Sequence, residues 1–118
     1  MRVKRIVADI RTQDIPAARR FYHDVLGLEL AMDQDWIATY RSPENAAVQI
    51  SFLSQGGSDA PVPDLSIEVD DLQAALEGMT ARGFVVEYGP VEEPWGVKRF
   101  FVRDPFGKLI NILEHLPR

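Results

Sequence analysis

Residues 65–83 read LSIEVDDLQAALEGMTARG, a stretch that contains a strand followed directly by a helix. Apolar and polar side chains alternate over its first five residues, as in a strand with one buried face. Asp71 stands at the expected N-cap of a helix, and Gly83 stands where a helix end needs a residue that tolerates a positive φ. The apolar residues between them recur at helical spacing, at Leu72, Ala75, Leu76 and Met79.

The same order of elements occurs earlier in the chain, in QDIPAARRFYHDVLGLEL at residues 13–30. Asp14 corresponds to Asp71 and Gly27 to Gly83, which indicates an internal repeat. The predicted apolar face of this first helix comprises Ile15, Ala18, Tyr22, Val25 and Leu26. Strand-like runs follow each helix, at 28–33, 36–41 and 46–53 in the first copy and at 84–88, 97–103 and 108–114 in the second.

The repeat predicts a single α+β domain over residues 1–118, made of two tandem β-α-β-β-β modules. The first module spans about residues 1–55 and the second about 62–118, and SQGGSDAPVP at 54–63 forms the linker. The chain has no cysteine, which excludes disulfides and thiolate metal sites. Its net charge of −5 disfavours nucleic acid as a partner. No signal peptide or membrane-spanning stretch is evident, so a cytoplasmic location is expected.

Alternation divides the predicted strands into an apolar and a polar face. Ile6, Ala8 and Ile10 of the first strand are expected to face the helices. The opposite face carries Asp9, Arg11, Gln49, Ser51, Asp64, Ser66, Glu68 and Asn111. Such a face can simply meet water. It also contains Val7, Ala47, Leu109 and Leu113, and this mixture is typical of a ligand pocket with a few orienting polar groups.

Three segments resemble the vicinal oxygen chelate superfamily, the group of glyoxalase I, bleomycin-resistance proteins and extradiol dioxygenases. They are ARRFYHDVLGLEL, LSIEVDDLQAALEGMTARG and EPWGVKRFFVRDPFGKLINILEH, and the resemblance covers nearly the whole chain. It implies that the two modules form a cupped mixed sheet. It also implies a homodimer, with the pocket either within one chain or between chains.

The resemblance places the metal-ligand positions of this family at Val7, Gln49, Asp64 and Asn111. Val7 cannot bind a metal, and the amides of Gln49 and Asn111 are poor ligands for a divalent transition metal. A catalytic site for such a metal normally has about three strong protein ligands. We therefore expect no metal ligands and no cofactor, with a divalent metal as the less favoured case.

Other candidate site residues follow from their surroundings in the sequence. Asp9 lies in an otherwise apolar strand and needs a partner, which is either a structural arginine or a ligand. Trp36 and Trp95 are either core residues or pocket walls, and Arg99 is a candidate for an anionic group. His23 is expected at the surface, whereas His115 has the same parity as Asn111 and could reach the edge of a site.

Three functions remain open. The first is a metal-independent binder of a small organic ligand of cationic or aromatic character, whose pocket is lined by Asp9, Trp36, Gln49, Ser51, Asp64, Trp95, Arg99 and Asn111. The second is a lyase, isomerase or dioxygenase with a rearranged oxygen-ligand site, which Mg²⁺ or Mn²⁺ could accept. The third is a dimeric protein without any small-molecule site.

Overall fold

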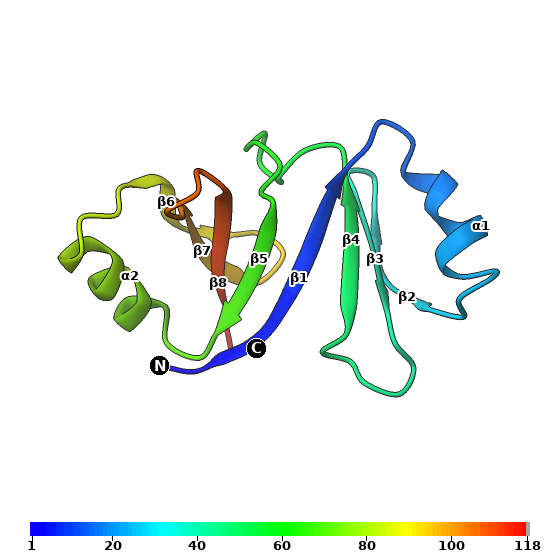
Figure 1. Ribbon diagram of the computed structural model, residues 1–118, viewed down its shortest axis with the longest axis horizontal. Coiled ribbons are helices and arrows are strands. Elements are labelled where there is room, and N and C mark those ends of the chain that lie inside the picture. Colours follow the sequence, from blue (N-terminus) through cyan, green and yellow to red (C-terminus); the bar gives the residue numbers. More distant parts are fainter. Residues whose placement is uncertain (118) are drawn as a thin grey trace. The chain divides into compact units, whose positions relative to one another are not determined.

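The structure is a computed structural model that describes residues 1–117. These residues form eight strands and two α-helices in the predicted order (Figure 1). The elements are β1 (Val3–Arg11), α1 (Ala18–Tyr22), β2 (Glu29–Gln34), β3 (Ile37–Arg41), β4 (Gln49–Leu53), β5 (Leu65–Val69), α2 (Leu72–Ala81), β6 (Val86–Glu93), β7 (Val97–Arg103) and β8 (Leu109–His115). Within the described residues, neither helix is long and apolar enough to cross a membrane.

The chain divides into two compact units, each a β-α-β-β-β module. The N-terminal unit comprises Val7–Val62, and the C-terminal unit comprises Met1–Ile6 together with the chain from Pro63 onward. The α+β class that the sequence predicts is therefore confirmed. The division falls inside β1, so this strand contributes residues to both units.

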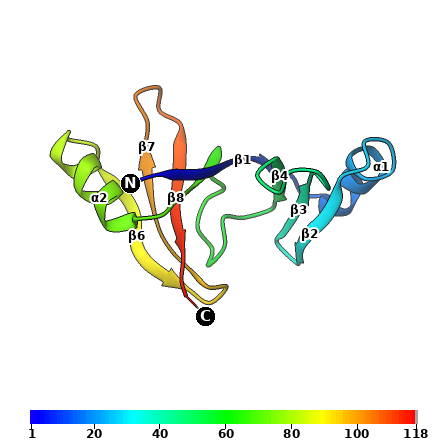
Figure 2. The same ribbon diagram turned by 90° about the horizontal axis from the view of Figure 1, so that it is seen from below.

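The C-terminal unit contains strands in the order β5-β8-β7-β6, with α2 alongside them (Figures 1 and 2). β5 pairs with β8 in parallel, and β7 pairs with both β8 and β6 in antiparallel fashion. The apolar face of these strands packs on α2 as the alternation predicts. The buried cluster consists of Val69, Leu72, Ala75, Phe100, Val102, Ile110 and Ile112.

The helix α2 begins and ends where the sequence indicates. The carboxylate of Asp71 accepts a hydrogen bond from the Ala74 amide at 3.0 Å, which satisfies one of the free amide groups of the first turn. Gly83 follows the helix with a φ of +82°. The capping residues therefore set both ends of this helix.

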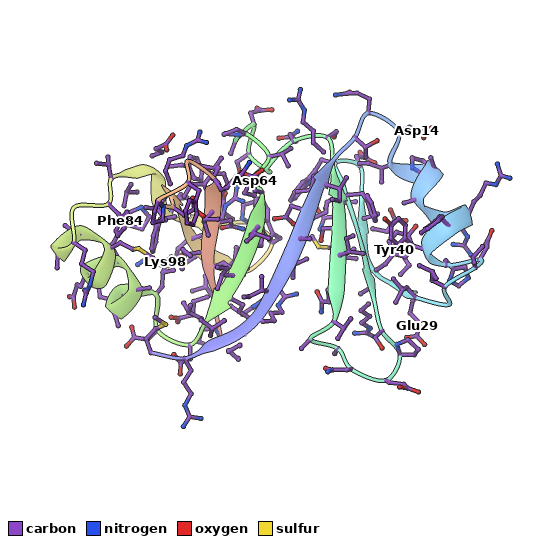
Figure 3. All side chains as sticks on the ribbon, viewed as in Figure 1. Asp14, Glu29, Tyr40, Asp64, Phe84 and Lys98 are labelled. Carbon is purple, nitrogen blue, oxygen red and sulfur yellow. The ribbon has the colours of Figure 1, made fainter. Side chains whose placement is uncertain are left out.

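The N-terminal unit contains strands in the order β2-β3-β4-β1, with β1 and β4 parallel. Its core is smaller and is built on Ala38, Tyr40 and Phe52. The Tyr40 side chain is directed toward α1 (Figure 3), and its ring lies 6.5 Å from that of Tyr22. A 3-10 turn at Ile15–Ala17 precedes α1, which has only five residues.

Two expectations for the first helix are wrong. Val25 and Leu26 are 74% and 56% exposed rather than buried, because the helix ends at Tyr22 and the chain then turns. Within this turn the Leu28 amide donates to the Tyr22 carbonyl at 3.0 Å. Asp14 makes no side-chain capping bond, so its role differs from that of Asp71.

Ile10 lies on the predicted helix-side face, because it is the Cα partner of the core residue Phe52, but the helices do not cover Ile6 and Ile10 as expected. Their side chains are 52% and 43% exposed. The short α1 packs against residues of β3 and β4, and it has too few turns to cover a further strand. β1 therefore keeps apolar side chains at the surface.

The strand β6 extends through Glu93, five residues beyond its predicted end at 88. Gly89 makes this possible with a φ of +79°. A Cβ atom at this position would lie 2.5 Å from the Arg99 carbonyl oxygen on β7. Only glycine allows the two backbones to come so close here.

Candidate functional site

The C-terminal unit has a second sheet face, opposite the one that packs on α2. Asn111 lies on it because its neighbours Ile110 and Ile112 belong to the helix-side core. In the register, Asn111 is the Cα partner of Ser66 on β5 and of Phe101 on β7. Tyr88 on β6 is in turn the partner of Phe101, with ring centroids 5.1 Å apart. One row across the four strands therefore contains a hydroxyl (Ser66), an amide (Asn111) and two aromatic rings (Phe101 and Tyr88), and we call it the Asn111 row.

The Asn111 side chain is buried and only partly satisfied. It is 7% exposed, and its Nδ2 atom donates to Ser66 Oγ at 3.0 Å. Its Oδ1 atom has no hydrogen-bond partner among residues 1–117. A buried acceptor without a partner is rare in folded proteins, so this oxygen is a strong candidate for contact with a ligand.

The Asp64 carboxylate is hydrogen-bonded to the main chain of the protein itself. It is exposed at the start of β5 (Figure 3), and its Oδ2 atom accepts from the Leu109 amide at 2.9 Å. The Asp64 amide donates to the Leu109 carbonyl at 2.8 Å. This carboxylate thus joins the beginnings of β5 and β8.

Arg99 is buried in a cluster on β6 and β7. Its Nε atom donates to Glu93 Oε2 at 2.7 Å, and the Tyr88 hydroxyl donates to the same oxygen at 2.9 Å. The guanidinium carbon lies 4.9 Å from the Trp95 ring centroid and 4.8 Å from that of Phe101. Arg99 and Trp95, both predicted site residues, are therefore in contact with each other.

Glu68 holds a second ion cluster on the same side of the strands. It is 8% exposed, and its carboxylate accepts from Arg5 Nε at 2.5 Å and contacts His115 Nδ1 at 2.9 Å. Burial raises the pKa of Glu68, but the hydrogen bonds from Arg5 and His115 outweigh it and lower the pKa overall. The half-exposed His115 ring is thus anchored through one nitrogen, an arrangement that suits proton transfer.

The polar face of the N-terminal unit carries a similar row. Asp9 is the Cα partner of Ser51, and Ser51 is the partner of Thr39. All three are buried, and the Thr39 and Ser51 hydroxyl oxygens lie 2.7 Å apart. The structure thus brings the predicted residues Asp9 and Ser51 together on adjacent strands.

The other predicted residues of this unit lie nearer the strand ends. Gln49 starts β4, and its Nε2 atom donates to the Ala46 carbonyl at 2.5 Å. Trp36 is half-buried in the turn between β2 and β3. Val7 is buried, with 4% exposure. A single pocket lined by all eight predicted residues stays a prediction.

Several residues of these clusters were not predicted as members of the site, among them Thr39, Tyr88, Glu93 and Glu68. Thr39 could have been predicted from alternation, because Ile37, Thr39 and Arg41 share one face of the predicted strand. Glu93 belongs to the part of β6 that the sequence does not mark as a strand, whereas Tyr88 is the last residue of the predicted strand at 84–88. Glu68 was expected on the polar face, but its pairing with Arg5 joins residues 63 positions apart.

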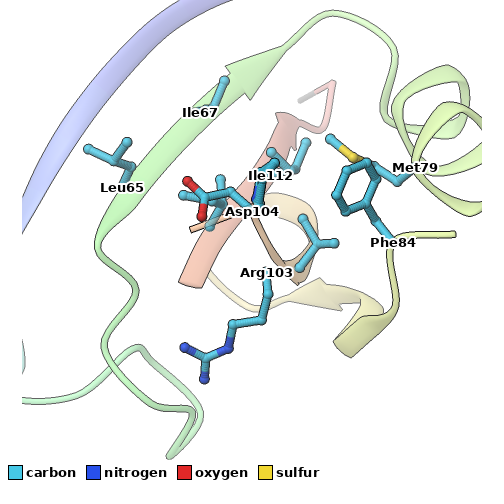
Figure 4. Close-up of a pocket in the computed structure, with 10 residues that line it drawn as sticks. Leu65, Ile67, Met79, Phe84, Arg103, Asp104 and Ile112 are labelled. Carbon is cyan, nitrogen blue, oxygen red and sulfur yellow. The ribbon is translucent and has the colours of Figure 1, made fainter. Parts of the chain in front are cut away.

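An apolar pocket of about 270 Å³ lies on the other face of the C-terminal unit, between its strands and α2 (Figure 4). Leu65, Ile67, Met79 and Phe84 line it together with side chains of β7 and β8. The Arg103 guanidinium extends away from these apolar groups and bonds Glu87 Oε2 at 2.6 Å. None of the eight predicted site residues lines this pocket.

The donor set at the metal positions implied by the resemblance does not fit a divalent transition metal. Val7 has no donor atom, and the Asp64 carboxylate and the Gln49 amide bond the main chain of this protein. Asn111 offers one neutral oxygen. Within residues 1–117, no three histidine or carboxylate side chains are grouped closely enough to hold a metal ion.

Comparisons with known proteins identify relatives of this fold. Residues 2–112 match the family described as the Glyoxalase/Bleomycin resistance protein/Dioxygenase superfamily. A search of curated proteins gives no match.

Solved structures of the same fold include the protein BH1468 from Bacillus halodurans C-125, with a TM-score of 0.78 and 18% identity over 100% of this chain and 98% of the other. Methylmalonyl-CoA epimerase from Mycobacterium tuberculosis has a TM-score of 0.73 and 23% identity, with 98% and 90% covered. The Q60A variant of methylmalonyl-CoA epimerase from Streptomyces coelicolor, in complex with 2-nitronate-propionyl-CoA, has a TM-score of 0.72 and 16% identity, with 98% and 100% covered.

Proposed function

Because the chain belongs to the Glyoxalase/Bleomycin resistance protein/Dioxygenase superfamily, we propose that it binds a small organic molecule without the divalent metal typical of many members. The observation that carries this proposal is the chemistry of Val7, Gln49, Asp64 and Asn111. A functional metal site in this family would need several strong ligands, and only Asp64 is one. The Asp64 carboxylate is already bonded to the Leu109 amide.

The polar sheet faces support a binding role. Each unit carries a row of short, mostly buried polar side chains on the face away from its helix, and the Asn111 row also contains the rings of Phe101 and Tyr88. A few orienting polar groups beside aromatic surface are typical of small-molecule sites. The ligand we propose is therefore aromatic, and the net charge of −5 also suits a cationic molecule.

The metal content of the protein tests this proposal directly. Protein purified without chelator is expected to contain far less than one equivalent of any transition metal by elemental analysis. Thermal-shift measurements with Ni²⁺, Zn²⁺ and Mn²⁺ should show no stabilisation, whereas a screen of small organic molecules should find stabilising ligands.

The matched control for this experiment is Asp64→Asn. The amide oxygen of this variant can still accept from the Leu109 amide, but it is a much weaker metal ligand. Stoichiometric metal in the wild type that is lost in Asp64→Asn would overturn the proposal. Equal metal content in both proteins would point to binding elsewhere.

A second candidate function is an isomerase, lyase or dioxygenase that uses oxygen ligands for Mg²⁺ or Mn²⁺. The observation that favours it is the Glu68–His115 pair, because a carboxylate-anchored imidazole can carry protons. The fold shared with methylmalonyl-CoA epimerase makes a CoA thioester the first substrate to assay. Epimerisation that depends on added Mg²⁺ or Mn²⁺ and is lost in His115→Gln would establish this alternative.

A further inference from the structure

The apolar pocket between α2 and the strands of the C-terminal unit has a surface that a ligand can reach. Its volume is about 270 Å³, and it opens to solvent. Leu65, Ile67, Met79 and Phe84 line it, and all four side chains are only half-buried. An apolar cavity of about 150 Å³ is enough to bind benzene. The pocket can therefore hold an aromatic ring together with a short chain.

The lining of the pocket favours an aromatic group. The Phe84 amide donates to the Met79 carbonyl at 3.0 Å, and Figure 4 shows the two side chains next to each other. A phenyl ring and a thioether both make favourable contacts with a further aromatic ring. The lining side chains of β5 and β8 are all aliphatic, so a polar group among them would lose its hydrogen bonds to water. The part of a ligand that enters the pocket is therefore apolar.

A carboxylate lies where the pocket meets solvent. The turn after β7 borders the pocket with Arg103 and Pro105, which are exposed, and with Asp104, which is half-buried. Asp104 Oδ1 accepts from the amides of Phe106 and Lys108, both at 2.9 Å. Among residues 1–117, no hydrogen bond or ion pair reaches its Oδ2 atom. One oxygen of Asp104 therefore holds the turn, and the other is available to a ligand.

The charges at this edge favour a cation. The Arg103 guanidinium bonds Glu87 Oε2 at 2.6 Å and the Gly107 carbonyl at 3.1 Å, and it extends away from the apolar lining (Figure 4). Glu87 thus balances the charge of Arg103, whereas the Asp104 carboxylate makes no ion pair within the part of the chain that the structure describes. A primary ammonium group has the complementary charge and three donor hydrogens.

We propose that this pocket binds a primary amine that carries an aromatic ring, with the ring between α2 and the strands and the ammonium group at Asp104 Oδ2. An apolar pocket with one orienting polar group is typical of small-molecule sites. The assignment goes beyond the proposed function, because the lining residues lie on the helix side of the sheet and the Asn111 row lies on the opposite face. It does not depend on whether the protein holds a metal.

2-Phenylethylamine and 2-phenylethanol are the probes that test the assignment. They have the same ring and chain length, but only the amine is charged at pH 7. With the methionine methyl groups labelled with ¹³C, NMR titration should shift the Met79 signal and leave those of Met1 and Met32 unchanged, because Met79 lines the pocket and the other two do not. The amine should bind about two- to fivefold more tightly than the alcohol, the range for a partly exposed ion pair, and the difference should shrink in about 1 M salt.

Two substitutions test the charge and the ring site separately. Asp104→Asn keeps an oxygen for the Phe106 and Lys108 amides but removes the negative charge, so it should bind both probes alike. Ile67→Phe fills the pocket with a larger side chain, so it should bind neither probe. Ile10→Phe is the matched control, because Ile10 is exposed and lies outside the pocket. It should bind both probes as the wild type does.

Several results would overturn the assignment. They are no shift of the Met79 signal up to the solubility limit of the probes, equal shifts of Met79 and Met32, or equal affinities of the wild type for amine and alcohol. An unchanged preference for the amine in Asp104→Asn, or wild-type binding by a folded Ile67→Phe variant, would also overturn it. If Ile67→Phe does not fold, the wild type and Asp104→Asn still decide the question. Stoichiometric metal would instead refute the proposed function, so the two failures are distinguishable.

Discussion

Glu68 is a residue whose contribution to stability depends on pH. Its carboxylate is 8% exposed and accepts from Arg5 at 2.5 Å, and it contacts His115 at 2.9 Å. Burial alone would raise its pKa, but these partners lower the pKa below the usual 4.5. A lowered folded-state pKa means that the stabilisation is present above the unfolded-state pKa and is lost as pH falls through the folded-state value.

We expect Glu68→Gln to lower the free energy of unfolding at pH 7 by about 1–3 kcal/mol, the scale for hydrogen bonds to a charged group. The difference from the wild type should begin to shrink as pH falls below the ordinary pKa of 4.5, and it should be lost once pH has passed the lowered folded-state pKa, where the wild-type carboxylate also becomes neutral. Urea unfolding at pH 7 and at pH 3.5 measures this. Lys4→Gln is the control, because the exposed Lys4 lies 3.7 Å from Glu68 and should change stability little. A difference that is the same at both pH values would contradict the expectation.

The amide side chains of Gln49 and Asn111 limit the chemistry of the site. Isomerisation of the methylglyoxal–glutathione hemithioacetal uses a metal as Lewis acid and a carboxylate as base. Neither amide can act as a base at neutral pH. We therefore expect no turnover of this substrate with added Ni²⁺ or Zn²⁺ in a spectrophotometric assay. Robust turnover that depends on either metal would show that other residues supply both functions.

Local alternation was enough to place several site residues on the correct face, among them Asn111, Ser66 and Ser51. It could not reveal what their side chains contact. Two such contacts are the hydrogen bond from the Leu109 amide to Asp64 and the ion pair of Arg99 with Glu93. Both depend on how the strands are aligned with each other. Such contacts follow from register, which hydrophobic periodicity does not encode.

The two helices behave differently although they occupy the same position in the repeat. In α2 the Asp71 side chain caps the first turn at 3.0 Å, whereas Asp14 makes no such bond. Pro16 and the 3-10 turn at Ile15–Ala17 change the backbone at the beginning of the first helix. Apolar spacing predicted a longer helix there, because the periodicity continues through Val25 and Leu26 after the helix has ended.

These caps give a matched pair of substitutions. Asp71→Ala should lower the free energy of unfolding by about 1 kcal/mol, within the usual range for an N-cap. Asp14→Ala should change it by less than about 0.5 kcal/mol, as a typical surface substitution does. Thermal and urea unfolding would measure both. Equal losses in the two variants would mean that Asp14 also stabilises its helix.

Two glycines with positive φ, Gly83 after α2 and Gly89 in β6, give a second matched pair. A Cβ at Gly89 would meet the Arg99 carbonyl oxygen at 2.5 Å, but a Cβ at Gly83 would meet nothing within 4 Å. Gly83→Ala should therefore cost only the conformational strain, about 1–2 kcal/mol. Gly89→Ala should cost clearly more, because β6 must also move away from β7. Urea unfolding that finds the same loss in both would contradict this close approach.

At the scale of the whole molecule, exposed apolar side chains are numerous. They include Val3, Ile6, Ile10, Val48, Val85 and Phe106. Exposed apolar side chains of this size can become buried when a partner covers them. The family resemblance adds to this expectation.

We therefore expect a homodimer at micromolar concentration, with a mass near twice 13.3 kDa in light scattering. A dilution series should show the monomer only at much lower concentration. A single species of one chain mass at micromolar concentration would rule out the dimer.

The order of the elements and the repeat were evident in the sequence, because short local patterns mark each module. Examples are Asp71 at the N-cap and the glycine after each helix. The division of β1 between the units was not evident. The strand sequence VKRIVADIR contains no glycine or proline to mark that Ile6 ends one unit and Val7 begins the other. That boundary depends on contacts between residues far apart in the chain.

This division has a consequence for any attempt to split the protein. The Arg2 amide donates to the Asp70 carboxylate at 2.6 Å, and the Asp70 amide donates to the Arg2 carbonyl at 3.1 Å. A protease cut between residues 54 and 63 would therefore not yield two self-sufficient fragments. Fragment 64–118 would lack Arg2 and Arg5, and a synthetic peptide of residues 1–6 added in trans would restore part of its missing edge. The C-terminal unit therefore needs a segment that is separated from the rest of it in sequence by the whole N-terminal unit.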